Sequence, residues 1–299
     1  MTTLTLNLPD HFHTAGILAY HRRDKQQIAE RIYDSADAPE QPTGLDKGIL
    51  WCGHPAMLSV RFFAGEAAVT LLTDSAASPD PTTLKHLAER MLGLHQDVSA
   101  FELTYSEHPL LGKLISRNPG LRIPAVATPF EAFAWAITGQ QISVSAAISI
   151  RSKLIRAANI WHSNGIFCFP AAQHISALNY QTLRDCGLSD SKTNCLLNLS
   201  RLVTEEDYLS DKWLESLGTE NVRQTLLSLK GIGPWTINYA LLRGFGWLDE
   251  SLETDAAVRR NLTQLLNMDD TISPAKTAAW LAQFSPYRSL VAAHLWEMG

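Results

Sequence analysis

Two short motifs in the second half of the chain carry the residues best suited to chemistry. The first is the run LKGIGPWT at residues 229–236, and the second is Asp255, twenty positions after Trp235 at the head of an expected helix. Two glycines around one apolar residue let the backbone approach another surface closely, and Pro234 presets the first turn of the next helix. The start of such a helix offers unpaired N–H groups and a partial positive charge to a phosphate. Together the motifs predict a phosphate-binding turn with a carboxylate behind it.

The segments on both sides of this turn are expected to be helices. Residues 222–229 have a helical pattern of apolar positions, and the following segment places Ile237, Leu241 and Gly244 on one face. Ile232 can fill the angle between the two helices. The pattern is typical of a helix-hairpin-helix, although a Gly-x-Gly-Pro run taken alone is more often a helix end followed by an N-terminal proline.

Asp255 and three aromatic side chains each have a structural interpretation beside a functional one. An aspartate before a helix is most often its N-cap, a role compatible with chemistry because the positive end of the helix stabilises the carboxylate. Trp235 and Tyr239 are four positions apart and share a helix face, and Trp296 lies in the last expected helix. Aromatic residues in such positions usually pack in the core.

The N-terminal part of the chain mixes strand and helix patterns. Residues 58–62 and 69–71 alternate between apolar and polar side chains on either side of a turn at Ala64-Gly65, which is typical of a β-hairpin. Residues 82–94 then have a helical pattern. We therefore expect an α/β domain over residues 1–115.

From residue 116 onward the patterns become helical. The run Thr128-Pro129-Phe130-Glu131 is a capping box for a helix that reaches Gly139, and residues 143–158 form the next helix. Further helices are expected to begin at Gln181, Val222, Trp235, Asp255 and Ser273, and the last runs from about Pro286 to Met298. The predicted fold class is α+β, with a second, helical domain over residues 116–299.

Composition excludes some classes of protein. The formal net charge of −5 argues against a protein that coats nucleic acid, because nonspecific affinity for nucleic acid comes mostly from Lys and Arg. It still allows a protein that binds DNA locally, through backbone N–H groups and a few arginines on one face. No apolar run reaches the roughly 18 residues of a membrane span and the first residues lack the basic start of a signal peptide, so we expect a cytoplasmic protein. The four cysteines lack the spacing of a zinc site and are expected to be buried free thiols.

Taken together, these motifs resemble the helix-hairpin-helix DNA glycosylase superfamily, and within it the bacterial 3-methyladenine DNA glycosylase II type. The resemblance extends over almost the whole chain. It rests on the run at 229–236, on Thr254-Asp255, on ITGQQISV at 137–144 and on the closing segments 286–289 and 294–296. It implies a small N-terminal α/β domain with an antiparallel sheet, followed by a mostly α-helical region in two helical subdomains. It also implies a base excision repair enzyme that flips alkylated bases, such as 3-methyladenine and 7-methylguanine, out of double-stranded damaged DNA and hydrolyses their N-glycosidic bonds.

The resemblance also assigns roles to residues at matching positions. It makes Asp255 the catalytic residue, which stabilises the positive charge that develops on the sugar. The base pocket, whose electron-rich rings attract a positively charged base, is formed by Trp235, Tyr239, Trp296 and Ile17, with Ile17 in place of a phenylalanine. The DNA contacts fall on Gly231, Gly233, Thr236, Gln140, Gln141 and Arg288, with Gln141 in place of an apolar wedge. A monovalent cation such as Na+ would be held by the backbone carbonyls of Leu227, Leu229 and Ile232.

The same resemblance also implies that the protein has no lyase activity and no cofactor. Trp235 occupies the position of the lysine that forms a Schiff base in bifunctional relatives, and Lys230 lies on the wrong side of the hairpin, so no AP lyase activity is expected. The four-cysteine loop of the cluster-bearing relatives is missing, so we expect neither an iron–sulfur cluster nor another cofactor. We expect a monomer with no membrane partner.

Three other functions remain open at this point. A non-enzymatic protein would use the hairpin only to bind DNA. A glycosylase for oxidised or deaminated bases would belong to a neighbouring family, and the oxidised-purine type requires the lysine that Trp235 replaces. A metal-dependent hydrolase using Asp249, Glu253 and Asp255 has the least support, because no histidine lies near them in the sequence.

Overall fold

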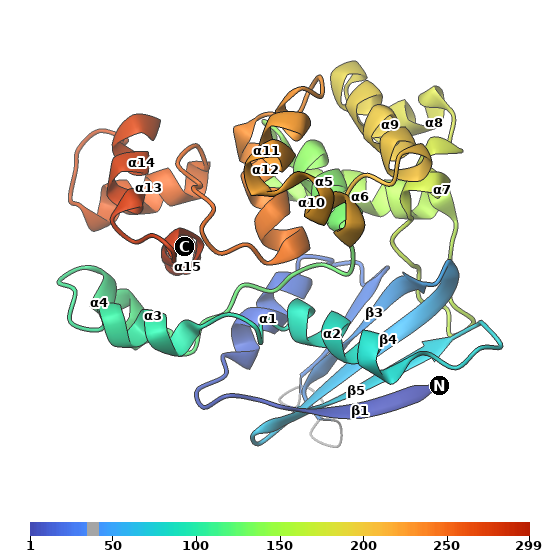
Figure 1. Ribbon diagram of the computed structural model, residues 1–299, viewed down its shortest axis with the longest axis horizontal. Helices are drawn as coiled ribbons and strands as arrows, with labels where there is room; N and C mark the ends of the chain where they lie inside the picture. The colour runs from blue at the N-terminus through green and yellow to red at the C-terminus, as the bar shows by residue number, and fades with distance from the viewer. Residues whose placement is uncertain (35–41) are drawn as a thin grey trace.

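The computed structural model describes residues 1–34 and 42–299 and confirms the α+β fold (Figure 1). Within the described residues, the N-terminal region forms a five-stranded antiparallel sheet with the strand order β1-β5-β4-β3-β2. The strands are β1 (Thr2–Asn7), β2 (Glu30–Tyr33), β3 (Gly44–Trp51), β4 (His54–Phe63) and β5 (Glu66–Thr73). The expected hairpin is the β4–β5 pair, in which Val60 lies opposite Val69 and Gly65 takes a φ of 74° in the turn.

Two helices pack against this sheet. The helix α1 (Thr14–His21) contributes Ile17 and Leu18 to a hydrophobic core that it shares with the strands and with α2 (Pro81–Met91). The α2 helix begins one residue before its predicted start, because the Asp80 carboxylate accepts a hydrogen bond from the Thr83 N–H. The sheet with these two helices is the α/β module that the sequence predicts.

The remaining helices form two hydrophobic cores. Their bounds are α3 (Val98–Tyr105), α4 (Leu111–Arg117), α5 (Pro129–Gly139), α6 (Val144–Ala158), α7 (Ala172–Ser176), α8 (Tyr180–Asp185), α9 (Asp190–Glu205), α10 (Asp211–Leu217), α11 (Thr219–Leu227), α12 (Pro234–Ala240), the π-helix η1 (Leu241–Phe245), α13 (Ala256–Leu265), α14 (Pro274–Ala282) and α15 (Arg288–Trp296). The first core joins α5 to α9, α11 and α12, and the second joins α3, α4 and α13 to α15. In Figure 1 the first group lies above the sheet and the second lies at the left. This arrangement confirms a mostly helical region in two subdomains.

Side chains of α5 and α12 connect the two cores. Ile137 and Ile237 belong to the first core, whereas Ala136 of α5 and Tyr239 of α12 belong to the second. The domain boundary expected between residues 115 and 116 falls inside α4, which packs with α3 and the C-terminal helices. By packing, the sheet module therefore ends after α2.

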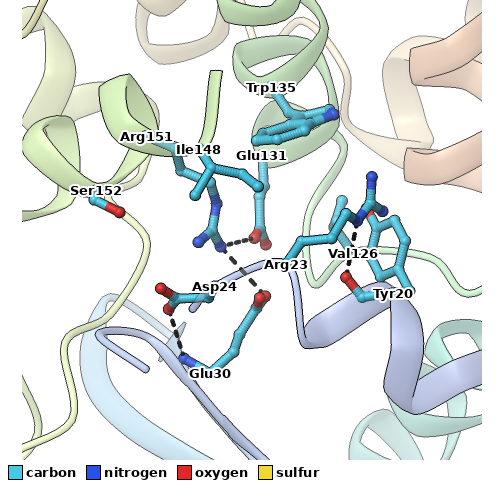
Figure 2. A pocket seen from close by; sticks show the side chains of 10 residues that line it. All are labelled: Tyr20, Arg23, Asp24, Glu30, Val126, Glu131, Trp135, Ile148, Arg151 and Ser152. Carbon is cyan, nitrogen blue, oxygen red and sulfur yellow. Dashed lines mark hydrogen bonds and ion pairs between the residues drawn. The ribbon is translucent and has the colours of Figure 1, made fainter. Parts of the chain in front are cut away.

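A buried cluster of charges joins the sheet to the helical region. The Lys47 ammonium group of β3 lies 2.5 Å from a Glu30 oxygen and 2.8 Å from a Glu131 oxygen, and Arg151 of α6 pairs with both carboxylates at 3.2 and 3.1 Å. Figure 2 shows the Arg151 guanidinium between the two glutamates. Burial raises the pKa of Glu30, but Lys47 and Arg151 outweigh it and hold the pKa well below its usual range.

The cluster changes the expected capping box of α5. The Thr128 hydroxyl accepts a hydrogen bond from the Glu131 N–H at 3.2 Å, as the capping box predicts. The Glu131 carboxylate, however, accepts a hydrogen bond from the Ala127 N–H and pairs with Lys47 instead of turning back to the Thr128 N–H. The glutamate that the sequence marks as a helix cap therefore also holds the sheet against α5.

Two expectations from composition can be compared with the structure. Cys168, Cys186 and Cys195 are buried free thiols as expected, and burial raises the pKa of each. The expectation is wrong for Cys52, whose thiol is free but exposed because it lies in the tight turn between β3 and β4. No helix in the described part of the chain is long and apolar enough to cross a membrane.

The buried imidazole of His294 makes the stability of the fold depend on pH. His294 is 1% exposed and stacks on Phe101 with ring centroids 5.6 Å apart. Burial, and to a lesser degree the charge of His13, lowers the pKa of His294 to about 4. The unfolded chain, whose histidine pKa is about 6.5, binds this proton more readily, so stability is lost as the pH falls from about 6.5 to about 4.

We expect the free energy of unfolding, measured by urea denaturation, to fall by roughly 3 kcal/mol across this pH window because of His294. The variant His294→Leu should lose this contribution and respond less to acid. An acid response as large in the variant as in the wild type would contradict the prediction.

Candidate active site

Asp255 lies at the start of α13 and is held by four hydrogen bonds. Its Oδ1 accepts the N–H groups of Ala257 and Val258, both at 3.0 Å, which confirms the predicted N-cap role. The same oxygen accepts the indole N–H of Trp296 at 3.2 Å, and Oδ2 accepts the indole N–H of Trp235 at 3.1 Å. Two backbone amides and two tryptophans therefore fix the direction of the carboxylate.

The two oxygens of Asp255 are unequally engaged. Among the described residues, Oδ1 accepts three hydrogen bonds, whereas Oδ2 accepts one, from Trp235. A carboxylate oxygen can accept more than one donor, so Oδ2 retains the capacity to act on a further partner. Asp255 is half-buried and lines a cavity, so this oxygen is the one available for chemistry.

The cavity beside Asp255 has a volume of about 1340 Å³ and lies where α1, α5, α12 and α15 meet. Trp235 and Tyr239 of α12 line it, with ring centroids 5.3 Å apart and planes inclined by 28°. Trp296 of α15 also lines it, 6.5 Å from the Tyr239 ring. The three aromatic residues expected in a base pocket therefore lie together around one cavity with the carboxylate.

The sequence interpretation missed several residues that line this cavity. Tyr20 and Arg23 come from α1 and the residues after it, Trp135 comes from α5, and Arg243 comes from η1. Arg243 follows Tyr239 by four positions, as Tyr239 follows Trp235, so the helical spacing carried a signal for it. Nothing in the spacing indicates the approach of α1, because that contact joins distant parts of the chain.

The expectation that Ile17 lines the base pocket is wrong. Ile17 is 1% exposed and packs in the hydrophobic core of the sheet module. The residues of α1 that line the cavity are instead Gly16, Ala19 and Tyr20. The departure from a phenylalanine at this position therefore does not bear on the cavity.

The helix-hairpin-helix is formed by α11, the loop at residues 228–233 and α12. Ile232 is 5% exposed and packs in the first helical core, as expected of a residue that fills the angle. Gly231 has a φ of 93°, and a Cβ atom there would lie 3.0 Å from Cys195 Cβ and 3.2 Å from its Sγ. Gly233 caps α12 with an ordinary φ of −107°, and a Cβ atom there would meet open space. Gly231 is therefore required by the backbone conformation and by packing against Cys195, whereas Gly233 leaves the surface of the turn without a side chain.

The two glycines should respond differently to substitution by alanine. We expect Gly231→Ala to lower the free energy of unfolding by about 1–3 kcal/mol, because it combines a strained φ with a close contact. Gly233→Ala should change stability by no more than about 0.5 kcal/mol, yet weaken duplex binding by adding a methyl group to the exposed turn. Urea denaturation and fluorescence anisotropy measure the two effects. Equal stability of the two variants would contradict the separate roles of Gly231 in folding and of Gly233 in DNA binding.

The residues expected to contact DNA are arranged around the hairpin, with one exception. Gln140 donates hydrogen bonds to the Gly231 carbonyl and to the Thr236 hydroxyl, both at 2.9 Å, so it braces the turn. Thr236 is buried, and Gln141 is exposed at the cavity rim with a φ of 54°. Arg288 lies outside the cavity lining and binds Asp249 at 2.7 Å. Contacts of all these residues with DNA stay predictions.

The other acidic residues near Asp255 differ in their surroundings. Asp249 is held by Arg288 and by the Ser285 hydroxyl and does not line the cavity. Glu253 lines the cavity, and its buried Oε2 has no hydrogen-bond partner among the residues that the structure describes. Glu253 is therefore the nearest competitor of Asp255 for a catalytic role.

Two metal expectations can be located in the fold. Leu227, Leu229 and Ile232 lie at the end of α11 and in the hairpin loop, where the Leu229 carbonyl accepts the Ile232 N–H at 3.0 Å. A cation held by their carbonyls stays a prediction. In the described ranges, Asp249, Glu253 and Asp255 do not gather as a group of metal ligands.

Comparisons with known proteins agree with this geometry. Residues 134–286, about half of the chain, match the family described as HhH-GPD superfamily base excision DNA repair protein. The DNA-3-methyladenine glycosylase of Bacillus subtilis is 24% identical over 69% of this chain and 68% of its own length. DNA-3-methyladenine glycosylase 2 of Escherichia coli is 27% identical over 62% of this chain and 63% of its own. The chain thus spans between 55% and 68% of the length of the first three curated relatives.

Solved structures show the same fold over the whole chain. The 3-methyladenine DNA-glycosylase from Archaeoglobus fulgidus superposes with a TM-score of 0.83 at 19% identity, covering 98% of this chain and 97% of that one. The Clostridium acetobutylicum 8-oxoguanine glycosylase/lyase in complex with DNA superposes with a TM-score of 0.75 at 14% identity, covering 99% and 94%. The chain therefore belongs to the HhH-GPD superfamily of base excision DNA repair proteins.

Proposed function

We propose that the chain is a monofunctional DNA glycosylase that excises alkylated bases, of the 3-methyladenine and 7-methylguanine type, from double-stranded DNA. The observation that carries the proposal is the carboxylate of Asp255, fixed by four donors at the wall of an aromatic cavity. The names of its relatives in Bacillus subtilis and Escherichia coli support this substrate class.

In this proposal the helix-hairpin-helix binds the DNA backbone. The N–H groups near Gly231 and Gly233 and the start of α12 favour a backbone phosphate, and the bare surface at Gly233 lets the phosphate approach. A base within a duplex is unreachable, so the nucleotide must leave the stack, at a cost of a few kcal/mol that is smaller for a damaged pair. Gln141, exposed at the rim of the cavity, fills the vacated space with its methylene groups and amide.

The chemistry of the proposed reaction is hydrolysis of the N-glycosidic bond. The bond between the base and C1′ breaks with its electron pair on the base, which leaves an oxocarbenium-like sugar. Asp255 Oδ2 places negative charge beside this sugar and directs the water molecule that adds to C1′, while the water proton passes to the carboxylate. An alkylated purine already leaves readily, so a strong general acid is not required.

Aromatic rings receive the flipped base. Trp235 and Tyr239 offer a stacked pair of electron-rich faces, and a desolvated cation–π contact contributes about 1–2 kcal/mol to binding of a positively charged base. The hydrogen bonds from the indoles of Trp235 and Trp296 to Asp255 tie the base-binding wall to the catalytic carboxylate. The same two residues thereby position both the base and the charge.

We expect no lyase activity, because among the described residues none of those lining the cavity is a lysine. Lys230 is exposed in the hairpin loop and lies outside the cavity lining. Borohydride reduction during the reaction should give no covalent protein–DNA adduct, since no amine reaches C1′ to form a Schiff base. A trapped adduct on a denaturing gel would contradict the monofunctional assignment.

The proposed function is tested by incubating the wild-type chain with methylated duplex DNA and resolving the released bases by chromatography. We expect free 3-methyladenine and 7-methylguanine, with intact strands until the abasic sites are cleaved by alkali. A protein that binds the duplex but releases no base from methylated or deaminated DNA would instead be a non-enzymatic DNA-binding protein.

A further inference from the structure

Three side chains that can bind a metal ion gather at the end of α2, the helix that packs on the sheet (Figure 1). They are His86, Glu89 and His95, and their ligand atoms all lie within 4.8 Å of one another. The Oε2 atom of Glu89 lies 3.9 Å from Nδ1 of His86 and 3.6 Å from Nε2 of His95. In the described part of the chain this is the one group of three or more such side chains that comes so close. None of the three lines the cavity beside Asp255.

The helix and the turn that ends it bring these side chains together. His86 and Glu89 are three positions apart in α2, so they share a face of the helix. After the helix, Gly93 takes a φ of 68°, and the Leu94 N–H donates to the Glu89 carbonyl at 2.8 Å, as in a Schellman motif. This turn reverses the direction of the chain, and His95 therefore lies beside Glu89.

The backbone around His95 is anchored to the segment that leads to α5. Nη1 of the buried Arg122 donates to the carbonyls of Gly93 and Gln96, both at 2.8 Å. The Gln96 side chain donates to the Ile123 carbonyl at 2.7 Å and accepts the Ile123 N–H at 2.9 Å. The positions of the three ligands are thus fixed by the fold, and their side chains alone have to move to close on an ion.

The ligand set suits zinc. Two imidazoles and one carboxylate are typical zinc ligands, whereas magnesium and calcium take mostly oxygen atoms. Zinc bonds to such ligands are about 2.0–2.1 Å long, so a tetrahedral ion holds its ligand atoms roughly 3.4 Å apart. The exposed side chains of His86 and His95 reach this spacing by rotation. The Lys85 ammonium group pairs with Oε1 of Glu89 at 3.8 Å and leaves Oε2 to the two imidazoles.

We propose that His86, Glu89 and His95 bind a zinc ion that links the last turns of α2 to the turn after it, with water in the fourth position. The ion exchanges with the solution, because only three protein ligands hold it at an exposed site. It stabilises the fold, since the folded chain brings together ligands that the unfolded chain keeps apart. The inference is independent of the proposed glycosylase function, because the site lies outside the cavity.

The test is isothermal titration calorimetry of the full chain, freed of metal by a chelator and dialysis, with Zn²⁺ alone. We expect one ion per chain. Glu89→Gln and His95→Ala should each weaken binding by about tenfold or more, because loss of even an indirect partner of a metal ion costs that much affinity. Zn²⁺ should also raise the melting temperature of the wild type more than that of either variant.

The matched control is His54→Ala, which removes another exposed histidine. His54 begins β4 on the same sheet, two positions after the exposed free thiol of Cys52, and the variant should bind Zn²⁺ as tightly as the wild type. A wild type that binds no Zn²⁺, or an unchanged affinity in either Glu89→Gln or His95→Ala, would overturn the inference. A loss of affinity in His54→Ala instead would place the zinc at the turn between β3 and β4 and would overturn it as well.

Discussion

Asp255→Asn should reduce the rate of base release on the order of 10³-fold while leaving duplex binding near the wild-type value. A carboxylate about 4 Å from a full positive charge stabilises it by roughly 4 kcal/mol at an effective dielectric constant of 20. That free energy corresponds to about a thousandfold in rate. The asparagine removes the negative charge but keeps an oxygen that can accept the Ala257 and Val258 N–H groups, so α13 keeps its N-cap. Single-turnover kinetics on a methylated duplex measure the rate, and fluorescence anisotropy measures the binding.

Glu253→Gln is the matched control, because Glu253 is the other acidic residue that lines the cavity and its Oε2 has no hydrogen-bond partner among the described residues. We expect it to change the rate by less than about tenfold, since only Asp255 is oriented by two indoles as well as by its own helix. A rate loss in Glu253→Gln that equals or exceeds the loss in Asp255→Asn would transfer the catalytic assignment to Glu253.

Lys47→Met should have the largest effect on stability of any single change considered for this fold. Lys47 is completely buried and neutralises Glu30 and Glu131 between the sheet and the helical region. Its removal leaves Arg151 as the remaining cation of the cluster beside two buried carboxylates. Breaking a buried ion pair from one side costs about 3–5 kcal/mol. We therefore expect a decrease of that size in the free energy of unfolding, measured by urea denaturation.

Lys85→Met provides the comparison for this change. Lys85 is exposed on α2, and its ammonium group lies 3.8 Å from a Glu89 oxygen in an i,i+4 pair. Exposed pairs of this kind contribute about 0.3–0.5 kcal/mol, so the variant should be nearly as stable as the wild type. Similar stabilities of Lys47→Met and Lys85→Met would show that the buried cluster contributes little.

The sequence predicts the local features of this fold well where one segment contains the whole signal. The bounds of α5 and α6, the β4–β5 hairpin and the N-cap of α13 all follow from caps, turns and periodicity within a few residues. The strand β3 was not predicted, because seven of its eight residues are buried and the strand shows no alternation of apolar and polar positions. The strand β1 does alternate between threonine and leucine, so its sequence carries the pattern of a half-buried strand.

The candidate site is only partly visible in the sequence. Trp235 and Tyr239 share a helix face, so one helix suffices to place them together. The cavity also depends on Tyr20 and Arg23, which reach it because α1 packs near α12, more than two hundred positions away. The sequence does not show which face of α1 packs against the sheet. The expectation that Ile17 lines the cavity fails for this reason, because Ile17 packs in the core of the sheet module.

The central claim is that the Asp255 carboxylate stabilises positive charge on the sugar, and it is tested most directly by the binding of two abasic duplexes. One carries a pyrrolidine nucleotide, whose protonated nitrogen stands for the positive charge near C1′, and the other carries a neutral tetrahydrofuran nucleotide of the same shape. We expect the wild type to bind the charged duplex at least about tenfold more tightly, a preference of roughly 1.4 kcal/mol or more, and Asp255→Asn to lose that preference. Equal affinity of the wild type for both duplexes, or an undiminished preference in Asp255→Asn, would contradict the account.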